Sequence, residues 1–176
     1  MEADEDLLAR VARGDGAALT RLAERHRRAL FGVLVRLLGD RCSAEEALQD
    51  TLLAVWRGAG GFAARSSVRT WLFGIARRQA AQRLRRRDPP PAELADELRD
   101  PAPGPEEVAV LAAGGSAVAA AVSRLPEHHR EVVALVLVGG LPLADAAAIL
   151  GVPVGTVKSR LFHARAAVVA MLAEEE

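Results

Sequence analysis

Apolar positions recur every three or four residues along most of the chain, and no segment keeps the strict alternation of a half-buried strand. This spacing predicts helices throughout, so we expect an all-α protein. The first long helix follows Asp15, whose carboxylate can cap a helix start. Its inward stripe is expected to comprise Leu19, Leu22, His26, Leu30, Val33 and Leu37.

A second helix is expected to open at Ser43, which precedes Glu46 at the spacing of a capping box. Its inward stripe comprises Ala44, Leu48, Thr51, Leu52 and Val55. The other side carries a second, partly apolar face. That face is formed by Gln49, Leu53 and Trp56, with Glu45 and Asp50 near its edges. It either packs against another helix of the same domain or serves as a docking surface anchored by the tryptophan.

Residues 58–62 are expected to form a flexible, glycine-rich loop that carries Phe62. From Arg65 to Arg87 the chain has eight arginines and no carboxylate, so nothing acidic nearby neutralises this block. A loop followed by an arginine-rich helix is suited to single-stranded DNA, with arginines on phosphates and an unstacked base in a loop pocket. The alternatives are a solvated helix end and a hydrophobic plug at Phe62. The aromatic candidates for stacking are Phe62, Phe73 and Trp71, of which Trp71 is expected in the core.

The tightest helix pair is expected near the C-terminus. Residues 143–150 form a short apolar helix, Gly151 can end it, and Pro153 suits the first turn of the next helix. Two helices joined by so short a turn are typical of a helix-turn-helix. In the second helix the inward positions are Val157, Leu161, Ala164 and Val168.

The opposite face of this second helix could meet base edges in a DNA major groove. It is expected to present Lys158, Ser159, Phe162 and His163, with Arg160 and Arg165 directed toward phosphates. The simpler alternative is a surface helix with solvated polar residues.

Composition narrows the class of protein. Half of the 176 residues are apolar, which supports real hydrophobic cores and argues against a disordered chain. One cysteine, Cys42, excludes an internal disulfide and a zinc site built on paired thiolates, so neither a metal nor a cofactor is expected. No apolar run approaches the roughly 20 residues that cross a bilayer. The acidic N-terminus differs from a signal peptide, and a cytoplasmic protein is expected.

The formal net charge of zero hides an uneven distribution. Residues 1–87 carry 17 basic and 10 acidic side chains, residues 88–123 one and seven, and residues 124–176 five and six. The acidic middle is also rich in proline and glycine. We expect it to be a tether between two small helical domains, with short helices near 92–99 and 106–121.

The order of these segments resembles the extracytoplasmic-function sigma factors of bacterial RNA polymerase. Residues 44–57, AEEALQDTLLAVWR, are similar to the core-binding helix of that family's region two. Residues 68–78, VRTWLFGIARR, are similar to the helix that follows. Leu125-Pro126 and Arg130, together with residues 151–160, GVPVGTVKSR, are similar to region four.

This resemblance covers residues 7–87 and 124–172 and implies a dissociable promoter-specificity subunit without catalytic residues. Region two would dock on the clamp helices of the largest polymerase subunit through Glu45, Gln49, Asp50, Leu53 and Trp56. It would capture the melted minus-10 element through Phe62, Ser66, Ser67, Arg69, Arg77, Arg78 and Arg85. Region four would contact the polymerase flap and read the minus-35 duplex through Thr156, Lys158, Ser159, Arg160, Phe162, His163 and Arg165. An anti-sigma factor is the further partner that the family implies.

The chain departs from the family pattern at three positions. Pro142 and Asp145 stand where the family usually has a hydroxyl cap and a glutamate, although a proline can still start a helix. His163 stands where the family often has an arginine, so the bidentate guanine contact of an arginine is not carried over.

Three other functions compete with this interpretation. A stand-alone helix-turn-helix regulator of operator DNA leaves the N-terminal domain unexplained. An enzyme or metal protein would use His128 and His129 with Glu127 or Glu131, but adjacent histidines point to different sides of a helix and no nucleophile accompanies them. A protein-interaction module that has lost DNA binding leaves the arginine block without a role.

Overall fold

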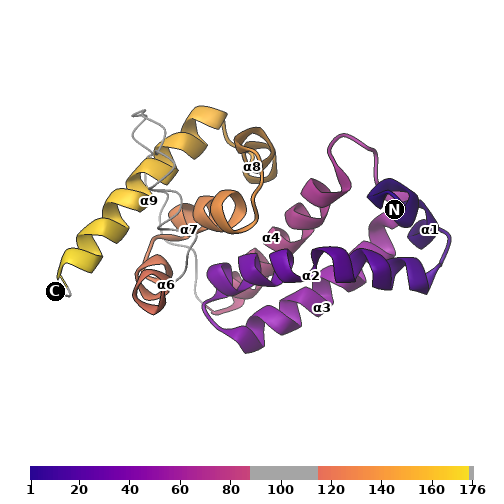
Figure 1. The fold of residues 1–176 in the computed structure, drawn as a ribbon, viewed down its shortest axis with the longest axis horizontal. Helices are drawn as coiled ribbons and strands as arrows, with labels where there is room; N and C mark the ends of the chain where they lie inside the picture. Colours follow the sequence, from indigo (N-terminus) through magenta and orange to yellow (C-terminus); the bar gives the residue numbers. More distant parts are fainter. Residues whose placement is uncertain (88–114, 175–176) are drawn as a thin grey trace. The chain divides into compact units, whose positions relative to one another are not determined.

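The computed structural model describes residues 1–87 and 115–174 of the chain (Figure 1). Contacts divide the chain into two compact units, one ending at Pro89 and the other beginning at Pro90. Every regular element in the described residues is helical, so the all-α prediction is confirmed. The helix predicted near 92–99 and the beginning of the one predicted at 106–121 lie outside the described residues. No helix in the described parts is both long and apolar enough to cross a membrane.

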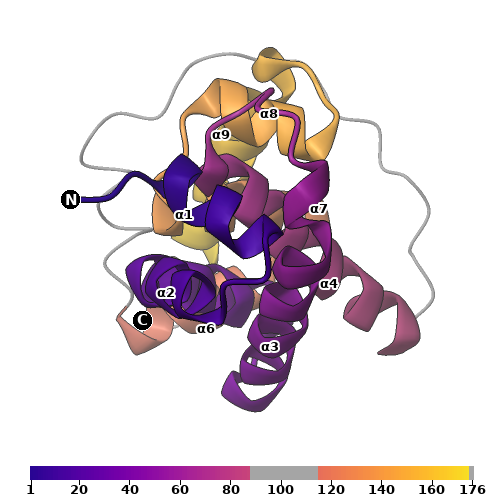
Figure 2. The same ribbon diagram turned by 90° about the vertical axis from the view of Figure 1, so that its right-hand side faces the viewer.

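Unit 1 is built on three long helices that pack against one another, with a short helix laid across them. Its elements are α1 (Asp4–Ala12), α2 (Gly16–Leu38), α3 (Arg41–Gly58), the 3-10 turn η1 (Ala59–Gly61) and α4 (Val68–Arg87). Helices α2, α3 and α4 contact each other, and α1 contacts α2 and η1. Both views of the ribbon show α1 beside the segment that leads into α4 (Figures 1 and 2). The largest fully buried side chains of this core include Leu22, Leu30, Leu48, Leu72 and Phe73.

Helix α2 begins where the sequence predicts. Asp15 caps it by accepting a hydrogen bond from the Ala18 N–H at 3.1 Å. Five of the six predicted inward residues are buried, and Leu19 is half-buried. The helix ends at Gly39, whose φ of 83° lies in the left-handed region that glycine adopts without strain.

Helix α3 begins earlier than predicted, so the capping role assigned to Ser43 is wrong. The cap is Asp40, whose carboxylate accepts the Ser43 N–H at 2.7 Å, and the first helical residue is Arg41. This backbone hydrogen bond also lowers the pKa of the Asp40 carboxyl. An aspartate directly after a glycine that ends α2 satisfies the first free N–H groups of α3, which leaves Ser43 inside the first turn.

Unit 2 surrounds the long C-terminal helix with shorter ones. Its elements are α6 (Ser116–Ser123), α7 (Glu127–Val132), the π-helical turn η2 (Val133–Val138), α8 (Leu143–Leu150) and α9 (Val154–Glu174). Helix α9 contacts α6, α7 and α8. Helix α6 falls within the range predicted as tether, yet it buries Ala121 and Val122 against this unit.

The turn between α8 and α9 follows the sequence expectation. Gly151 ends α8 with a φ of 67°, and the Pro153 carbonyl accepts backbone N–H groups of the first turn of α9. Pro142 precedes α8 and its carbonyl accepts the N–H groups of Asp145 and Ala146, so the helix forms without a hydroxyl cap. The four predicted inward residues of α9 are all buried.

Candidate nucleic-acid and partner interfaces

The outer face of α3 is open to solvent. Leu53 is 45% exposed and Trp56 is 38% exposed, and Gln49 and Glu45 beside them are also exposed. Two alternatives were left open for this face, and the described residues favour the second, because no helix of unit 1 covers it. A tryptophan and a leucine together in solvent are typical of a surface that binds a partner.

The edge of this face is tied to α4 by an arginine. Arg83 donates to Asp50 at 2.6 Å and to Glu46 at 2.8 Å, and the hydrogen bond to Asp50 raises the pKa of Arg83. Arg87 in turn donates to the Leu38 carbonyl at 3.2 Å and contacts Asp40. The prediction that nothing acidic neutralises the arginine block is therefore wrong for Arg83 and Arg87. Their carboxylates are distant in sequence and are brought close by the packing of α3 and α4.

The remaining arginines of α4 differ in exposure. Arg78 and Arg85 are exposed, while Arg77 is half-buried. Arg69 is half-buried as well, and its guanidinium lies over the Phe73 ring at 5.0 Å from the centroid. Arg78 and Arg85 are thus the members of the predicted DNA-binding set on α4 that are most accessible to phosphates.

The segment between α3 and α4 is more ordered than predicted. Ala59–Gly61 forms the 3-10 turn η1 against α1, and Ala59 is buried, so the expectation of a flexible loop at 58–62 is wrong. Phe62 is half-buried and packs edge-on against Trp71, with ring centroids 5.4 Å apart. This contact favours the hydrophobic plug for part of the Phe62 ring. Phe73 is fully buried and is not available for stacking on a base.

The two serines that precede α4 have different surroundings. Ser67 accepts the Thr70 N–H on its hydroxyl at 3.1 Å and so caps the first turn of α4. Ser66 is exposed and donates to the Ser67 carbonyl at 3.1 Å. Ser66 can therefore turn toward a ligand more readily than Ser67.

A hollow of ≈ 260 Å³ lies between α3 and α4 and was not anticipated from the sequence. Its lining comprises Ala54, Gly58, Trp71, Ile75, Arg78, Gln79 and Gln82. No signal in the sequence reveals it, because α4 carries polar side chains along its length and the hollow depends on how α3 and α4 pack. A second hollow of ≈ 380 Å³ lies between α2 and α3 and is lined by Glu24, Arg27, Arg28, Phe31, Arg41 and Glu45.

The solvent-facing side of α9 differs from the predicted one. Ser159 is only 1% exposed and Thr156 is buried too, so the expectation that Ser159 lies on the free face is wrong. Helix α9 packs against three other helices, so its buried face is wider than a single stripe of residues. The half-exposed members of the predicted set are Lys158, Arg160, Phe162, His163 and Arg165. Val154, at the start of the helix, is exposed and was missed.

The histidines of unit 2 lie near one another on α7 and α9. The rings of His128 and His129 are 4.3 Å apart, and those of His129 and His163 are 6.2 Å apart. Among the described residues, no group of three histidine, cysteine or carboxylate side chains is placed to hold a metal ion.

Two protein families match the two units of the chain. Sigma-70 region 2 matches residues 22–89, and Sigma-70 region 4 matches residues 116–168.

Curated relatives match over nearly the whole chain. RNA polymerase sigma-H factor of Pseudomonas aeruginosa is 32% identical, covering 95% of this chain and 92% of the relative. ECF RNA polymerase sigma factor SigM of Mycobacterium tuberculosis is 38% identical, covering 96% of this chain and 84% of the relative.

Solved structures share the fold. CnrH in complex with the cytosolic domain of CnrY matches with a TM-score of 0.72 and 27% identity, covering 99% of this chain and all of the matched one. The sigma factor RpoE in complex with the anti-sigma factor NepR from Bartonella quintana matches with a TM-score of 0.63 and 24% identity, covering 89% and 98%. The second likeness concerns the fold alone.

Proposed function

Because the chain belongs to the extracytoplasmic-function sigma factors of bacterial RNA polymerase, we propose that it docks on the core enzyme through α3 and holds promoter DNA at two separate places. Sigma factors are DNA-binding regulatory proteins and not catalysts. The stand-alone operator-binding regulator is not favoured, because both units match sigma-factor regions.

The single observation that carries the docking proposal is the exposed pair of Leu53 and Trp56 on α3. Their side chains anchor the contact with the clamp helices of the largest subunit, with Gln49 and Glu45 extending the same stripe. Asp50 contributes to docking indirectly, because its ion pair with Arg83 holds α3 against α4.

The minus-10 element is captured as a melted strand by unit 1. Arg78 and Arg85 bind its phosphates, while the segment from Phe62 to Ser67 and the adjacent edge of Trp71 accept an unstacked base. Arg69 and Arg77 are only half-exposed and take the flanking phosphates.

The minus-35 element is read as duplex by α9. Lys158, Phe162 and His163 reach base edges in the major groove, and Arg160 and Arg165 position the helix on the backbone. The buried Ser159 supports the helix from within. The same unit contacts the polymerase flap.

An anti-sigma factor is the partner that controls this activity. Two of the matched structures are complexes, one of CnrH with the cytosolic domain of CnrY and one of the sigma factor RpoE with the anti-sigma factor NepR. We expect a comparable protein to bind this chain in the cytoplasm and to compete with the polymerase.

The experiment that tests the proposal is a selection of promoters. Core polymerase reconstituted with the chain transcribes a library of random DNA, and the initiating molecules are sequenced. Two conserved blocks separated by a fixed spacer are expected upstream of the start sites. Transcripts that show no such blocks, or only one of them, would contradict the two-contact mechanism.

A further inference from the structure

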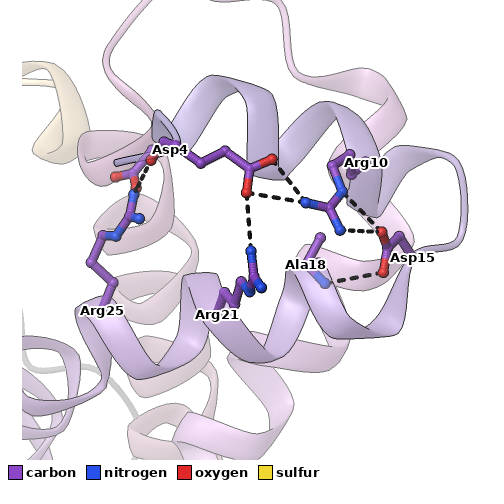
Figure 3. A network of polar contacts seen from close by, with 7 residues as sticks. Asp4, Arg10, Asp15, Ala18, Arg21 and Arg25 are labelled. Carbon is purple, nitrogen blue, oxygen red and sulfur yellow. Dashed lines mark hydrogen bonds and ion pairs between the residues drawn. The ribbon is translucent and has the colours of Figure 1, made fainter.

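Helix α1 is fastened to α2 by a set of charged side chains near the N-terminus (Figure 3). Arg10 donates to both carboxylate oxygens of Glu2, at 2.8 and 3.0 Å. Arg21 on α2 lies 3.4 Å from Glu2, and Arg25 contacts Asp4. We call Glu2, Asp4 and their partners Arg10, Arg21, Arg25 and His26 the N-terminal clip.

One contact of the clip is buried. His26 is 5% exposed, and its Nε2 lies 2.6 Å from Asp4 Oδ2. Within the described residues the other ring nitrogen, Nδ1, has no partner, so Asp4 is the group that holds the imidazole. Burial raises the pKa of Asp4, but hydrogen bonds from Arg25 and His26 outweigh it and the pKa is lowered overall. Asp4 therefore stays charged at neutral pH.

Besides α2, helix α1 contacts the elements on either side of the segment proposed to capture DNA. Leu7, Leu8 and Val11 are buried, and α1 contacts both η1 and α4. The chain runs directly from η1 to Phe62 and the serines before α4. Helix α1 is therefore a brace, held to α2 by the clip and in contact with η1 and α4, the two elements that flank residues 62–67.

The brace lies outside the part of the chain that matches sigma region 2. That match begins at residue 22, after α1 has ended. Helix α1 also contacts α3, but Leu53 and Trp56 of the docking face are exposed to solvent, and none of the clip residues lies on that face. Loosening α1 should therefore affect the segment at 58–67 more than the docking face.

We propose that Glu2 and Asp4 are positioning residues for promoter capture: the clip fixes α1 against α2 so that residues 58–67 are held ready for the melted strand. This inference rests on the proposed function. A segment that is already ordered loses less conformational entropy when it closes on a ligand, and the affinity for that ligand is higher.

The chain offers a matched control on the same helix. Glu5 and Asp6 are exposed and have no ion pair or hydrogen bond within the described residues. The pair Glu5→Gln and Asp6→Asn removes the same charge as Glu2→Gln and Asp4→Asn. Both pairs also remove negative charge near the positive end of the α1 dipole, so this contribution is similar in the two variants.

The test compares three affinities. Two are measured with the full chain bound to core polymerase: the affinity for a single-stranded minus-10 oligonucleotide and the affinity for a minus-35 duplex. The third is the affinity of the chain for core polymerase. The Glu2→Gln, Asp4→Asn variant is expected to bind the single strand roughly fivefold more weakly or worse, the lower end of couplings between sites in one protein. The other two affinities should stay within about twofold, and the control variant should match the wild type.

Hydrogen exchange gives an independent readout. Amides of residues 59–67 should exchange faster in the clip variant than in the control. Asp4→Glu, which keeps the carboxylate, should recover at least part of the lost single-strand affinity. If the double substitution lowers the melting temperature below the assay range, the single Glu2→Gln substitution is used, because the Glu2 side chain is 29% exposed and that of Asp4 only 19%.

Three results would overturn the inference. One is unchanged single-strand affinity in the clip variant, one is an equal loss in the control, and one is a parallel loss of all three affinities, which would mean that the clip only stabilises the fold. Failure of the wild-type chain to bind core or to capture the strand is a different result. It would reject the proposed function itself.

Discussion

Residues of the two units differ in how much of their side chain is available to bind a partner or DNA. Trp56 offers a large apolar surface to a partner, Lys158 offers a mobile cation, and Ser159 offers nothing to solvent although it is adjacent to Lys158. Burial and exposure at single positions thus decide which substitutions act on binding and which act on folding.

Replacing Trp56 with alanine should weaken the affinity for core polymerase by about 2 kcal/mol, which is the cost of removing a central aromatic anchor. Arg28 is also exposed but lies on α2, outside the stripe formed by Gln49, Leu53 and Trp56, so Arg28→Ala serves as the control. Fluorescence anisotropy of the labelled chain titrated with core measures both. Equal affinities for the two variants would remove α3 from the interface.

Lys158→Ala and Ser159→Ala, at adjacent positions, should have different effects: the first on DNA binding and the second on stability. Loss of the Lys158 cation should weaken binding to duplex DNA of any sequence. It should also reduce the salt slope, the slope of the logarithm of the binding constant against the logarithm of the salt concentration, by about one. Ser159→Ala should change thermal stability, because the hydroxyl is buried, while the salt slope stays as in the wild type. A salt slope that falls in Ser159→Ala and not in Lys158→Ala would contradict the orientation of α9.

At the scale of elements, helix ends and helix pairs explain what could be predicted. The stripe that α2 buries and the Gly151 turn followed from spacing and from the known preferences of caps and turns. Three features did not follow. Helix α3 is capped by Asp40 and not by Ser43. Arg83 forms an ion pair with Asp50 on another helix. Ser159 is buried by neighbouring helices that sequence spacing does not reveal.

The cap at Asp15 should carry a measurable part of the stability of unit 1. Asp15→Ala removes the hydrogen bond to the Ala18 N–H and the ion pair with Arg10, so a loss of about 1 kcal/mol in the free energy of unfolding is expected. Glu24→Gln, an exposed change on the same helix, is the control. Urea denaturation followed by circular dichroism measures both, and equal midpoints would show that the cap is dispensable.

The stabilisation that Asp4 provides between α1 and α2 should depend on pH. Because the folded pKa of Asp4 is lowered from 3.8, its ionised form stabilises the fold above that value, and the contribution is lost as the pH falls through the folded pKa. The stability difference between wild type and Asp4→Asn should therefore be larger at neutral pH than below pH 3.8, where it shrinks. Urea midpoints across that range measure it, and a difference that grows on acidification would contradict the sign.

At the scale of the whole molecule, the chain consists of two helical units, and we propose that each binds one promoter element. The resemblance seen in the sequence is confirmed by matches to sigma regions 2 and 4 and by relatives that align over nearly the full chain. The candidate site was predictable in outline, since the exposed α3 face and the α9 helix were found from periodicity. The hollow lined by Gln79 and Gln82 was not, because it depends on how α3 and α4 pack.

Transcription in a defined system tests the central claim most directly. Core polymerase, the chain and a template carrying a promoter recovered by selection are combined, and the 5′ ends of the transcripts are mapped. Start sites at one fixed distance from the promoter, absent when the chain is left out and reduced by Trp56→Ala, are the predicted result. A chain that binds duplex DNA tightly by itself but neither associates with core polymerase nor directs initiation would contradict the account.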